Sequence, residues 1–390
     1  MTPAARLAAA MDVLDRVQAG ANAEQALTQW SRASRFAGSG DRAAVRDHVF
    51  TALRCLRSHA VLGGGGSGRA LVLGGLRAAG RDPEALFTGE GHAPAPLTEA
   101  ERTHLAHSPE LPPLAALDCP DWLAPVLKES LGDDFAPVME ALRHRAPVFL
   151  RVNTARASVD EAAASLATEG IATRPGPLAN TALEVTENER KIRNSAAFRE
   201  GLVELQDAAS QALVAALPAA SGQRVLDYCA GGGGKSLALA ARGGLEVFAH
   251  DADPARMQDL LARAARAGAR IGRLDTADVA RAAPFDLVLL DVPCSGSGSW
   301  RRAPEAKWRL TRGRLDDLCS IQREILEDTV YYVAKFGYLA YATCSLIEAE
   351  NGAQIEGFLA AHPEWKMTAE HRFTPRDGGD GFYLALLTRK

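Results

Sequence analysis

Two cysteines in this 390-residue chain follow predicted strands, and the thiol of a cysteine is suited to covalent chemistry. Cys294 comes after FDLVLLDVP, and Cys344 comes directly after GYLAYAT. Parallel α/β sheets bind ligands at the carboxyl ends of their strands, so we expect both thiols at that edge. A lone buried cysteine is usually an inert, small apolar side chain, which is our expectation for Cys55, Cys119 and Cys319. Two thiols at one edge instead favour chemistry at sulfur.

A glycine-rich turn joins the predicted strand QRVLDYCA to the start of a helix. Glycines there let backbone amides approach a ligand closely, and the helix dipole points at that ligand. A nucleotide phosphate, a dinucleotide and S-adenosylmethionine compete for this site, and a flexible loop without a ligand is the alternative. Cys229 stands where the Walker pattern needs its first glycine, and four successive glycines match dinucleotide templates by chance. The candidate cofactor residues of the turn are Cys229, Ala230, Gly231, Gly232, Gly233, Gly234 and Lys235.

Three aspartates follow or end the later strands and extend this candidate cofactor site. Asp251 ends LEVFAHD, where a carboxylate can accept both ribose hydroxyls of a nucleoside cofactor, as in NAD and S-adenosylmethionine sites. Asp275 follows the next strand candidate and is placed to meet the adenine, whereas Asp291 ends FDLVLLD and borders the cofactor. Taken singly, Asp251 and Asp275 are more often helix caps or loop carboxylates.

The elements that carry these residues belong to the last of three predicted domains. Residues 1–115 have apolar positions at helical period and predict an all-α domain that ends in the linker TGEGHAPAPLTEAERTHLAHSPELPP. Residues 120–200 mix helices with short strands and predict a small α/β module. Residues 201–390 alternate short apolar runs with amphipathic stretches, which predicts a parallel sheet wrapped by helices. The fold class is therefore α/β.

Composition narrows the kind of protein further. Hydrophobic residues make up 47% of the chain and charged residues 24%, as in an ordinary folded globular protein. A net charge of -4 does not decide for or against a polyanionic partner, because a local basic surface suffices. No apolar run approaches the roughly 20 residues that span a bilayer, so we expect a cytoplasmic protein without membrane contact. The six cysteines form no CxxC pair, which predicts free thiols and no metal site.

Seven blocks in order along the chain resemble the RsmB/Sun-type (Nop2/Sun) family of RNA cytosine-5 methyltransferases. They are ELQDAASQ, LDYCAGGGGKS, DVPCSGSG, RRAPEAKW, IQREIL, YATCSLIEAEN and DGGDGFYLALL. The chain departs from the family at Gly231 and Gly232, where the family has alanine and proline. The resemblance implies a Rossmann-like class I methyltransferase domain at 201–390, S-adenosylmethionine as cofactor and 16S rRNA as substrate. It also implies a NusB-like RNA-binding domain at 1–115 and an RNA-binding module at 120–200.

The resemblance also implies roles for four side chains. Carbon 5 of cytosine is too poor a nucleophile to take a methyl group directly, so a thiolate must first add at carbon 6. Cys344 is implied as that thiolate, and Cys294 is the candidate that assists release of the product. Asp291 can hydrogen-bond the base as the adduct forms. Lys235 either orients Asp291 or anchors the start of its helix.

A basic segment, WRRAPEAKWRLTRGR, follows the Cys294 block. It predicts that Arg301, Arg302 and Lys307 hold RNA phosphates while Trp308 stacks on a base. The alternative is a solvated basic loop with one tryptophan in the core. We expect a monomer that binds single-stranded or extruded RNA. A catalytically idle rRNA assembly factor is the rival to an active enzyme.

Overall fold

The computed structural model describes residues 1–107 and 109–390, and the chain forms two units. The first unit contains Met1–Arg145 and Trp300–Arg309, and the second contains Ala146–Ser299 and Leu310–Lys390. The first unit is therefore built from two separate stretches of sequence. The domain boundaries that we expect near residues 115 and 200 stay predictions.

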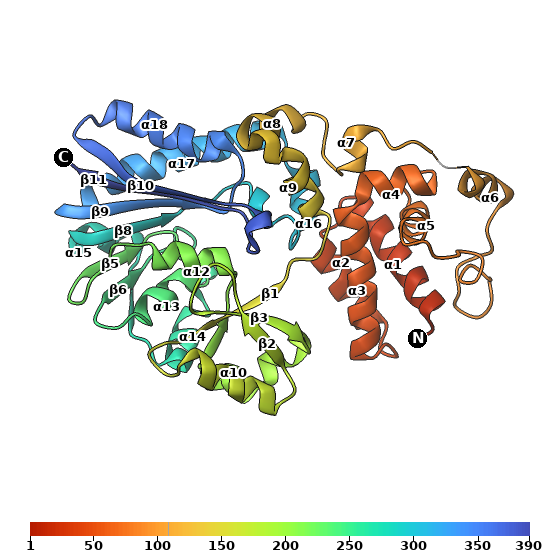
Figure 1. Cartoon of the computed structure of the whole chain (residues 1–390), viewed down its shortest axis with the longest axis horizontal. Coiled ribbons are helices and arrows are strands. Elements are labelled where there is room, and N and C mark those ends of the chain that lie inside the picture. Colours follow the sequence, from red (N-terminus) through yellow and green to blue (C-terminus); the bar gives the residue numbers. More distant parts are fainter. Residues whose placement is uncertain (108) are drawn as a thin grey trace. The chain divides into compact units, whose positions relative to one another are not determined.

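Helices make up the regular structure described in the first unit, as the apolar spacing of its sequence predicts (Figure 1). Thr2 begins the first helix because its hydroxyl accepts a hydrogen bond from Ala5 N. Side chains such as Leu14, Val49 and Leu71 are fully buried in its core. The helices are α1 (Pro3–Gln18), α2 (Ala23–Ala33), α3 (Ser39–Arg54), α4 (Leu56–Gly63), α5 (Gly68–Ala78), α6 (Glu99–Ala106), α7 (Pro113–Ala116), α8 (Ala124–Leu131), α9 (Phe135–Leu142) and α16 (Pro304–Arg309).

The stretch predicted as a linker contains a helix, α6. Thr98 and Glu101 cap its start reciprocally, each side chain bonding the other residue's backbone N–H. Arg69 pairs with Glu101 at 2.6 Å and so ties this helix to α5. Ser108, within the same predicted linker, lies outside the described residues. The linker prediction was wrong for α6. The prolines and glycines around this segment indicate a linker, whereas its capping residues, Thr98 and Glu101, indicate a helix.

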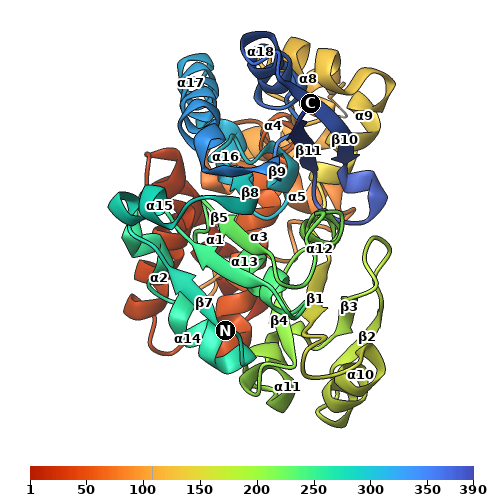
Figure 2. The ribbon, with the colours of Figure 1, turned by 90° about the vertical axis from the view of Figure 1, so that its left-hand side faces the viewer.

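The second unit contains two sheets and the helices that cover them (Figures 1 and 2). Its strands are β1 (Val148–Val152), β2 (Ala172–Pro175), β3 (Ala182–Glu187), β4 (Val203–Leu205), β5 (Arg224–Asp227), β6 (Glu246–Ala249), β7 (Ile271–Arg273), β8 (Phe285–Asp291), β9 (Val333–Thr343), β10 (Trp365–Phe373) and β11 (Phe382–Arg389). Its helices are α10 (Val159–Thr168), α11 (Ala196–Arg199), α12 (Ala208–Ala215), α13 (Gly234–Ala240), α14 (Leu260–Ala267), α15 (Thr276–Ala282), α17 (Arg312–Thr329) and α18 (Gly352–Ala361).

The larger sheet has seven strands in the order β10-β11-β9-β8-β5-β6-β7. Strands β7, β6, β5, β8 and β9 are parallel, whereas β11 pairs antiparallel with both β9 and β10. Leu287 and Leu289 of β8 pack in one core with α12 and α13, and Val288 and Leu290 pack on the other face with α17 and α18. This alternation is the period of two that a strand buried on both faces requires. The predicted Rossmann-like fold is confirmed.

The smaller sheet has the order β2-β3-β1-β4, and its paired strands are antiparallel. Leu150 of β1 and Leu166 of α10 are fully buried in the core that this sheet forms with α10. The predicted strands PVFLRVN and ALEVT are confirmed as β1 and β3, and the sheet has two further strands. These two, β2 and β4, have only four and three residues and gave no clear apolar run in the sequence.

The order of the larger sheet reverses direction at β5, since β6 lies on one side of it and β8 on the other. In open α/β sheets such a switch point opens a crevice at the carboxyl ends of the strands, where ligands bind. The glycine turn follows β5, and the two candidate cysteines follow β8 and β9. The fold therefore gathers the predicted chemical groups at one edge.

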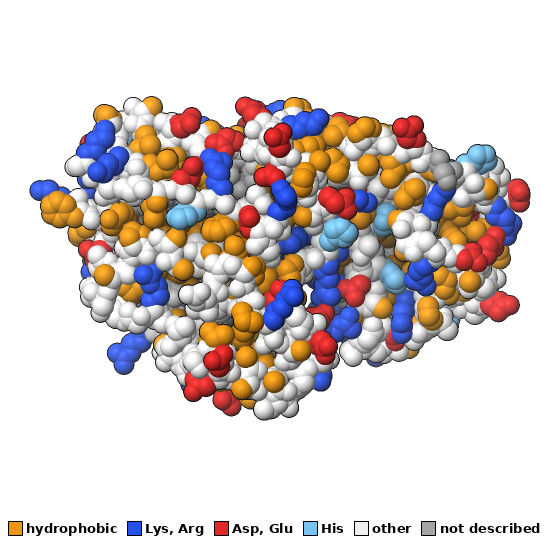
Figure 3. Space-filling view, viewed as in Figure 1, with side chains coloured by type: hydrophobic (Ala, Val, Ile, Leu, Met, Phe, Trp, Pro, Cys, Tyr) orange, Lys and Arg blue, Asp and Glu red, His pale blue; other side chains and the backbone are white. Residues whose placement is uncertain are grey.

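Expectations from the sequence also concern membrane-spanning helices, metal sites and disulfides. Among the described residues, no helix is both long and apolar enough to cross a membrane. The same part of the chain has no group of three or more His, Cys, Asp or Glu arranged to hold a metal ion. All six cysteines are free thiols. On the face drawn in Figure 3, acidic and basic side chains are interspersed, in keeping with the small net charge.

Candidate active site

The sulfurs of Cys294 and Cys344 lie 3.4 Å apart. Their strands, β8 and β9, are parallel neighbours, with Asp291 opposite Ala342, so the loops after these residues emerge side by side. The pKa of Cys294 is raised well above its usual value, because its thiol is hydrogen-bonded with Cys344 and is removed from water. Cys294 therefore keeps its proton at neutral pH and shares a hydrogen bond with Cys344 in which either thiol can be the donor.

Lys235 and Asp291 form an ion pair beside the two thiols. Lys235 Nζ donates to Asp291 Oδ2 at 2.6 Å, and the lysine side chain is buried. Burial lowers the pKa of Lys235, but the Asp291 carboxylate outweighs burial and raises it overall, with smaller contributions from Asp227 and Cys344. Lys235 thus stays protonated and holds the Asp291 carboxylate in place, which is the contact that an orienting role requires.

The glycine turn has backbone angles that favour glycine. Gly231 has φ +53° and Gly233 has φ +78°, both in the left-handed region. A Cβ atom at Gly233 would lie 2.1 Å from the Leu260 side chain. Gly231 N donates to Asp251 Oδ2 at 2.9 Å, which ties the turn to the end of β6. At Gly231 the chain has glycine where the family has alanine, and the left-handed angle suits the glycine.

The other predicted cofactor residues lie at the same edge. Asp251 is buried and also pairs with Arg256 at 3.3 Å. Asp275 is exposed at the start of α15 without a side-chain capping bond. Burial raises the pKa of Cys229, so it is an uncharged thiol that lines the turn. Their contacts with ribose, adenine or the cofactor backbone stay predictions.

Asp227, the last residue of β5, belongs to this edge but was not predicted as a site residue. Its Oδ2 accepts a hydrogen bond from Ser236 Oγ at 2.6 Å, whereas its Oδ1 is buried without a hydrogen-bond partner among the described residues. A buried acceptor without a partner fits the ammonium group of S-adenosylmethionine. The available signal was a carboxylate ending an apolar strand directly before the glycine turn.

Replacing Asp227 with asparagine is expected to stabilise the chain increasingly as the pH rises from 4 to 7. Burial raises the pKa of Asp227 to about 6, from 3.8, so the folded state favours the protonated acid, which asparagine mimics. The unfolded chain loses this proton first, so the stability of the native sequence falls between pH 3.8 and 6. The expected gain is on the order of 1–3 kcal/mol at pH 7, measured by scanning calorimetry without cofactor.

The exposed Asp275 provides the matched control, since Asp275→Asn should show no difference from the native chain that grows with pH. A stability difference for Asp227→Asn that is flat or shrinks between pH 4 and 7 would contradict the burial argument.

Most of the predicted RNA-binding segment, Trp300–Arg309, lies in the first unit, and much of this part is buried. Lys307 is 1% exposed and Arg301 5%. Lys307 Nζ donates to Arg54 O at 3.4 Å, and Trp308 Nε1 donates to Leu53 O at 2.7 Å. Arg301 and Lys307 are therefore buried in this structure, and their contacts with RNA phosphates stay predictions. Arg302 is exposed, so its contact with RNA stays a prediction, as does stacking on the half-buried Trp308.

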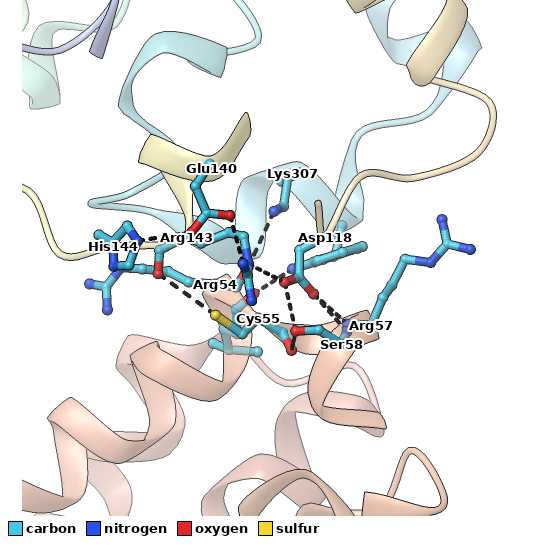
Figure 4. A network of polar contacts seen from close by, with 11 residues as sticks. Arg54, Cys55, Arg57, Ser58, Asp118, Glu140, Arg143, His144 and Lys307 are labelled. Atoms are coloured by element: carbon cyan, nitrogen blue, oxygen red, sulfur yellow. Dashed lines mark hydrogen bonds and ion pairs between the residues drawn. The ribbon is translucent and has the colours of Figure 1, made fainter. Parts of the chain in front are cut away.

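A buried carboxylate, Asp118, acts electrostatically on the buried Lys307. Asp118, fully buried, accepts hydrogen bonds from Ser58 N and Oγ and pairs with Arg143 at 2.9 Å (Figure 4). Burial lowers the pKa of Lys307 to about 8, and the Asp118 charge opposes this fall. The basic residues of this segment are thus partly structural, which their spacing in the sequence does not reveal.

The sheet order, with the glycine turn at its switch point, defines a Rossmann-like methyltransferase domain. Residues 214–388 match the family described as 16S rRNA methyltransferase RsmB/F, and residues 119–191 match the ferredoxin-like domain of RsmF/B-like methyltransferases. Along these two stretches the chain matches the RsmB/F methyltransferase family. The resemblance seen in its seven sequence blocks is thereby confirmed.

Two curated relatives carry the name ribosomal RNA small subunit methyltransferase B. The protein from Vibrio cholerae is 33% identical over 70% of this chain and 65% of its own length. The protein from Xanthomonas campestris is 34% identical over 69% of this chain and 66% of its own length. The chain thus spans slightly less than two thirds of these relatives.

Solved structures share the fold. A methyltransferase homolog from Pyrococcus horikoshii covers 71% of this chain and 97% of its own, at 24% identity and TM-score 0.63. NSun6 from Pyrococcus horikoshii with SFG covers 69% and 98%, at 17% identity and TM-score 0.61. A third crystal structure covers 100% of this chain and 99% of its own, at 24% identity and TM-score 0.77.

Proposed function

We propose that this chain transfers a methyl group from S-adenosylmethionine to carbon 5 of a cytosine in RNA, with small-subunit (16S) rRNA as substrate. The observation that carries the proposal is the pair of thiols 3.4 Å apart beside the Lys235–Asp291 ion pair. A second thiol in contact with a nucleophilic one suits a reaction that must both make and break a bond to sulfur. The family and its relatives support rRNA as the substrate.

S-adenosylmethionine, when bound, supplies an electrophilic methyl group at the carboxyl edge of the sheet. Asp227 Oδ1, which is buried and has no hydrogen-bond partner in the described part of the chain, would hold the ammonium group of the cofactor. The Asp251 carboxylate would receive the ribose hydroxyls while it keeps Gly231 in place. Asp275, at the start of α15, would meet the adenine.

Cys344 makes the first covalent bond of the proposed reaction. Its thiolate adds to carbon 6 of the cytosine, and the electrons of the 5,6 double bond then make carbon 5 nucleophilic. The Asp291 carboxylate can accept a hydrogen bond from the exocyclic amine of the base as the adduct forms. Protonated Lys235 holds Asp291 at 2.6 Å and places positive charge where negative charge develops.

Cys294 acts in the second half, after carbon 5 has taken the methyl group. The proton on carbon 5 must leave, its electron pair restores the double bond, and the carbon–sulfur bond to Cys344 breaks. The hydrogen bond with Cys344 is the foremost cause of the raised pKa of Cys294. That cause is removed once Cys344 bonds to carbon 6, so Cys294 then loses its own proton more readily, and its thiolate can take the carbon 5 proton.

A tritium-release assay tests the proposed atom and substrate together. With 16S rRNA labelled with tritium at carbon 5 of cytidine, we expect one tritium released to water for each methyl group transferred. RNA labelled at carbon 6 should keep its tritium and serves as the matched control. Methyl transfer without tritium release would mean another target atom. Calorimetric binding of S-adenosylmethionine without any methyl transfer would favour the idle assembly factor.

A further inference from the structure

Glu350 is a fully buried carboxylate in a short 3-10 helix, Glu348–Glu350, that follows the Cys344 loop. Its Oε1 accepts hydrogen bonds from Ser295 N at 2.7 Å and from Gln322 Nε2 at 3.1 Å. Its Oε2 accepts from Ser295 Oγ and from Ser345 Oγ, each at 2.5 Å. One side chain therefore binds the residue after Cys294 and the residue after Cys344.

A buried carboxylate is costly unless donors satisfy it, and here four donors do. Both serines directly follow the cysteines, so the carboxylate fixes the backbone of the two loops at the sulfur-bearing residues. Removal of the carboxylate would leave these buried donors without an acceptor, which is unfavourable. The network is therefore expected to hold one geometry rather than several.

Further hydrogen bonds join the same two loops. Gly298 N donates to Cys344 O at 2.9 Å, and Leu346 N donates to Ser297 Oγ at 2.7 Å. A Cβ atom at Gly298 would lie 2.1 Å from Gly381 O, so this loop is also packed closely on the other side. Glu350 is therefore the charged residue of a hydrogen-bond network that joins the Cys294 and Cys344 loops, and backbone groups of these loops take part in it.

We propose that Glu350 is a positioning residue that holds the Cys294 and Cys344 thiols in contact. It acts through Ser295 and Ser345 and does not touch the base. Its kinetic consequence rests on the proposed methyltransferase function, whereas its effect on the distance between the thiols does not. Misplacement of a reacting group by about 1 Å can slow a reaction by about 10²-fold. Loss of the hydrogen bonds that Glu350 accepts from the two loops should therefore reduce kcat more than it changes KM.

The kinetic test compares Glu350→Gln with Glu348→Gln. Glutamine keeps the size of the side chain but accepts hydrogen bonds at one atom only. Glu348 is a matched control, because it lies in the same short helix but is partly exposed and pairs with Arg372. We expect Glu350→Gln to lower kcat about 10–100-fold with KM for RNA within about 2-fold, and the control to keep native kcat. The affinity for S-adenosylmethionine, measured by calorimetry, should be unchanged in both.

A cross-linking test measures the contact between the Cys294 and Cys344 thiols without any methyl transfer. Diamide, an azo oxidant, accepts two hydrogens from two thiols, so that a disulfide and a hydrazine form. In the native full-length chain the neighbouring thiols should join quickly, and mass spectrometry of the peptides would show a Cys294–Cys344 bond. Glu350→Gln should slow this bond formation about 10-fold or more, and Glu348→Gln should not.

A milder variant guards against an effect on folding. Ser345→Ala removes one donor only and should slow turnover and cross-linking less than Glu350→Gln. The double variant should be no slower than Glu350→Gln alone, because both changes break one connection. Native rates for Glu350→Gln in both tests would overturn the proposal. So would a variant that loses cofactor affinity together with its rates, since Glu350 would then be merely structural. Rapid cross-linking in a native chain that methylates no RNA would refute the proposed function and leave the positioning role standing.

Discussion

Replacing Cys344 with alanine is expected to abolish methyl transfer to RNA, with turnover lowered by at least about 10⁴-fold. Without the sulfur no bond to carbon 6 forms, so carbon 5 never becomes nucleophilic enough to take the methyl group. The measurement is incorporation of labelled methyl from S-adenosylmethionine into 16S rRNA, with a denaturing gel to look for a protein–RNA adduct. The variant should form none.

Cys319→Ala is the matched control for this result. Cys319 lies on α17, and its thiol donates to Ala349 O at 3.4 Å rather than to a group of the candidate site. It should keep turnover within about 2-fold, as a surface-proximal change away from special features usually does. If Cys344→Ala methylates RNA at the control rate, Cys344 is not the nucleophile.

Replacing Cys294 with alanine should have the opposite signature and trap the RNA on the protein. Cys344 can still attack carbon 6, and carbon 5 can still take its methyl group, but the group that assists removal of the carbon 5 proton is gone. A complex that survives denaturation should therefore accumulate and be seen as a shifted band of labelled RNA. Its yield should approach one RNA per active site while multiple turnover is lost.

The double variant Cys294→Ala/Cys344→Ala separates a trapped adduct from mere tight binding. It should give no denaturation-resistant band, because the bond that survives denaturation is the one to Cys344. A band that persists in the double variant, or a Cys294→Ala chain that turns over normally, would remove Cys294 from the reaction.

The larger sheet could be predicted where its strands are long or strongly apolar. FDLVLL and GYLAYA became β8 and β9 because their Val, Leu and Tyr side chains are buried on both faces of the sheet. The three-residue β7 was much harder to delimit, since Gly272 and Arg273 are exposed and leave no apolar run. The site at the carboxyl edge followed from the parallel order, which is why Cys294, Cys344 and Asp291 could be placed together.

Other parts of the site could not be predicted because their meaning depends on distant partners. Arg301 and Lys307 read as a phosphate-binding stripe, but Lys307 is buried near Asp118, a residue far away in the sequence. YATCSLIEAEN contains two glutamates, Glu348 and Glu350, and only the fold shows that Glu350 is the fully buried one. The spacing of residues in the sequence predicts which side chains are exposed only when their packing partners are also close in the sequence.

The first unit is built from two separate stretches of sequence, and this affects when it can fold during synthesis on the ribosome. Residues 1–145 leave the ribosome first, but Trp300 and Lys307, each 1% exposed in the finished unit, have not yet been synthesised. At translation rates of about 5–20 residues per second, roughly 8–30 s pass before they arrive. During that interval the nascent helices expose the surface that later buries this segment. We therefore expect the N-terminal helices to complete their fold late, after most of the second unit has been made.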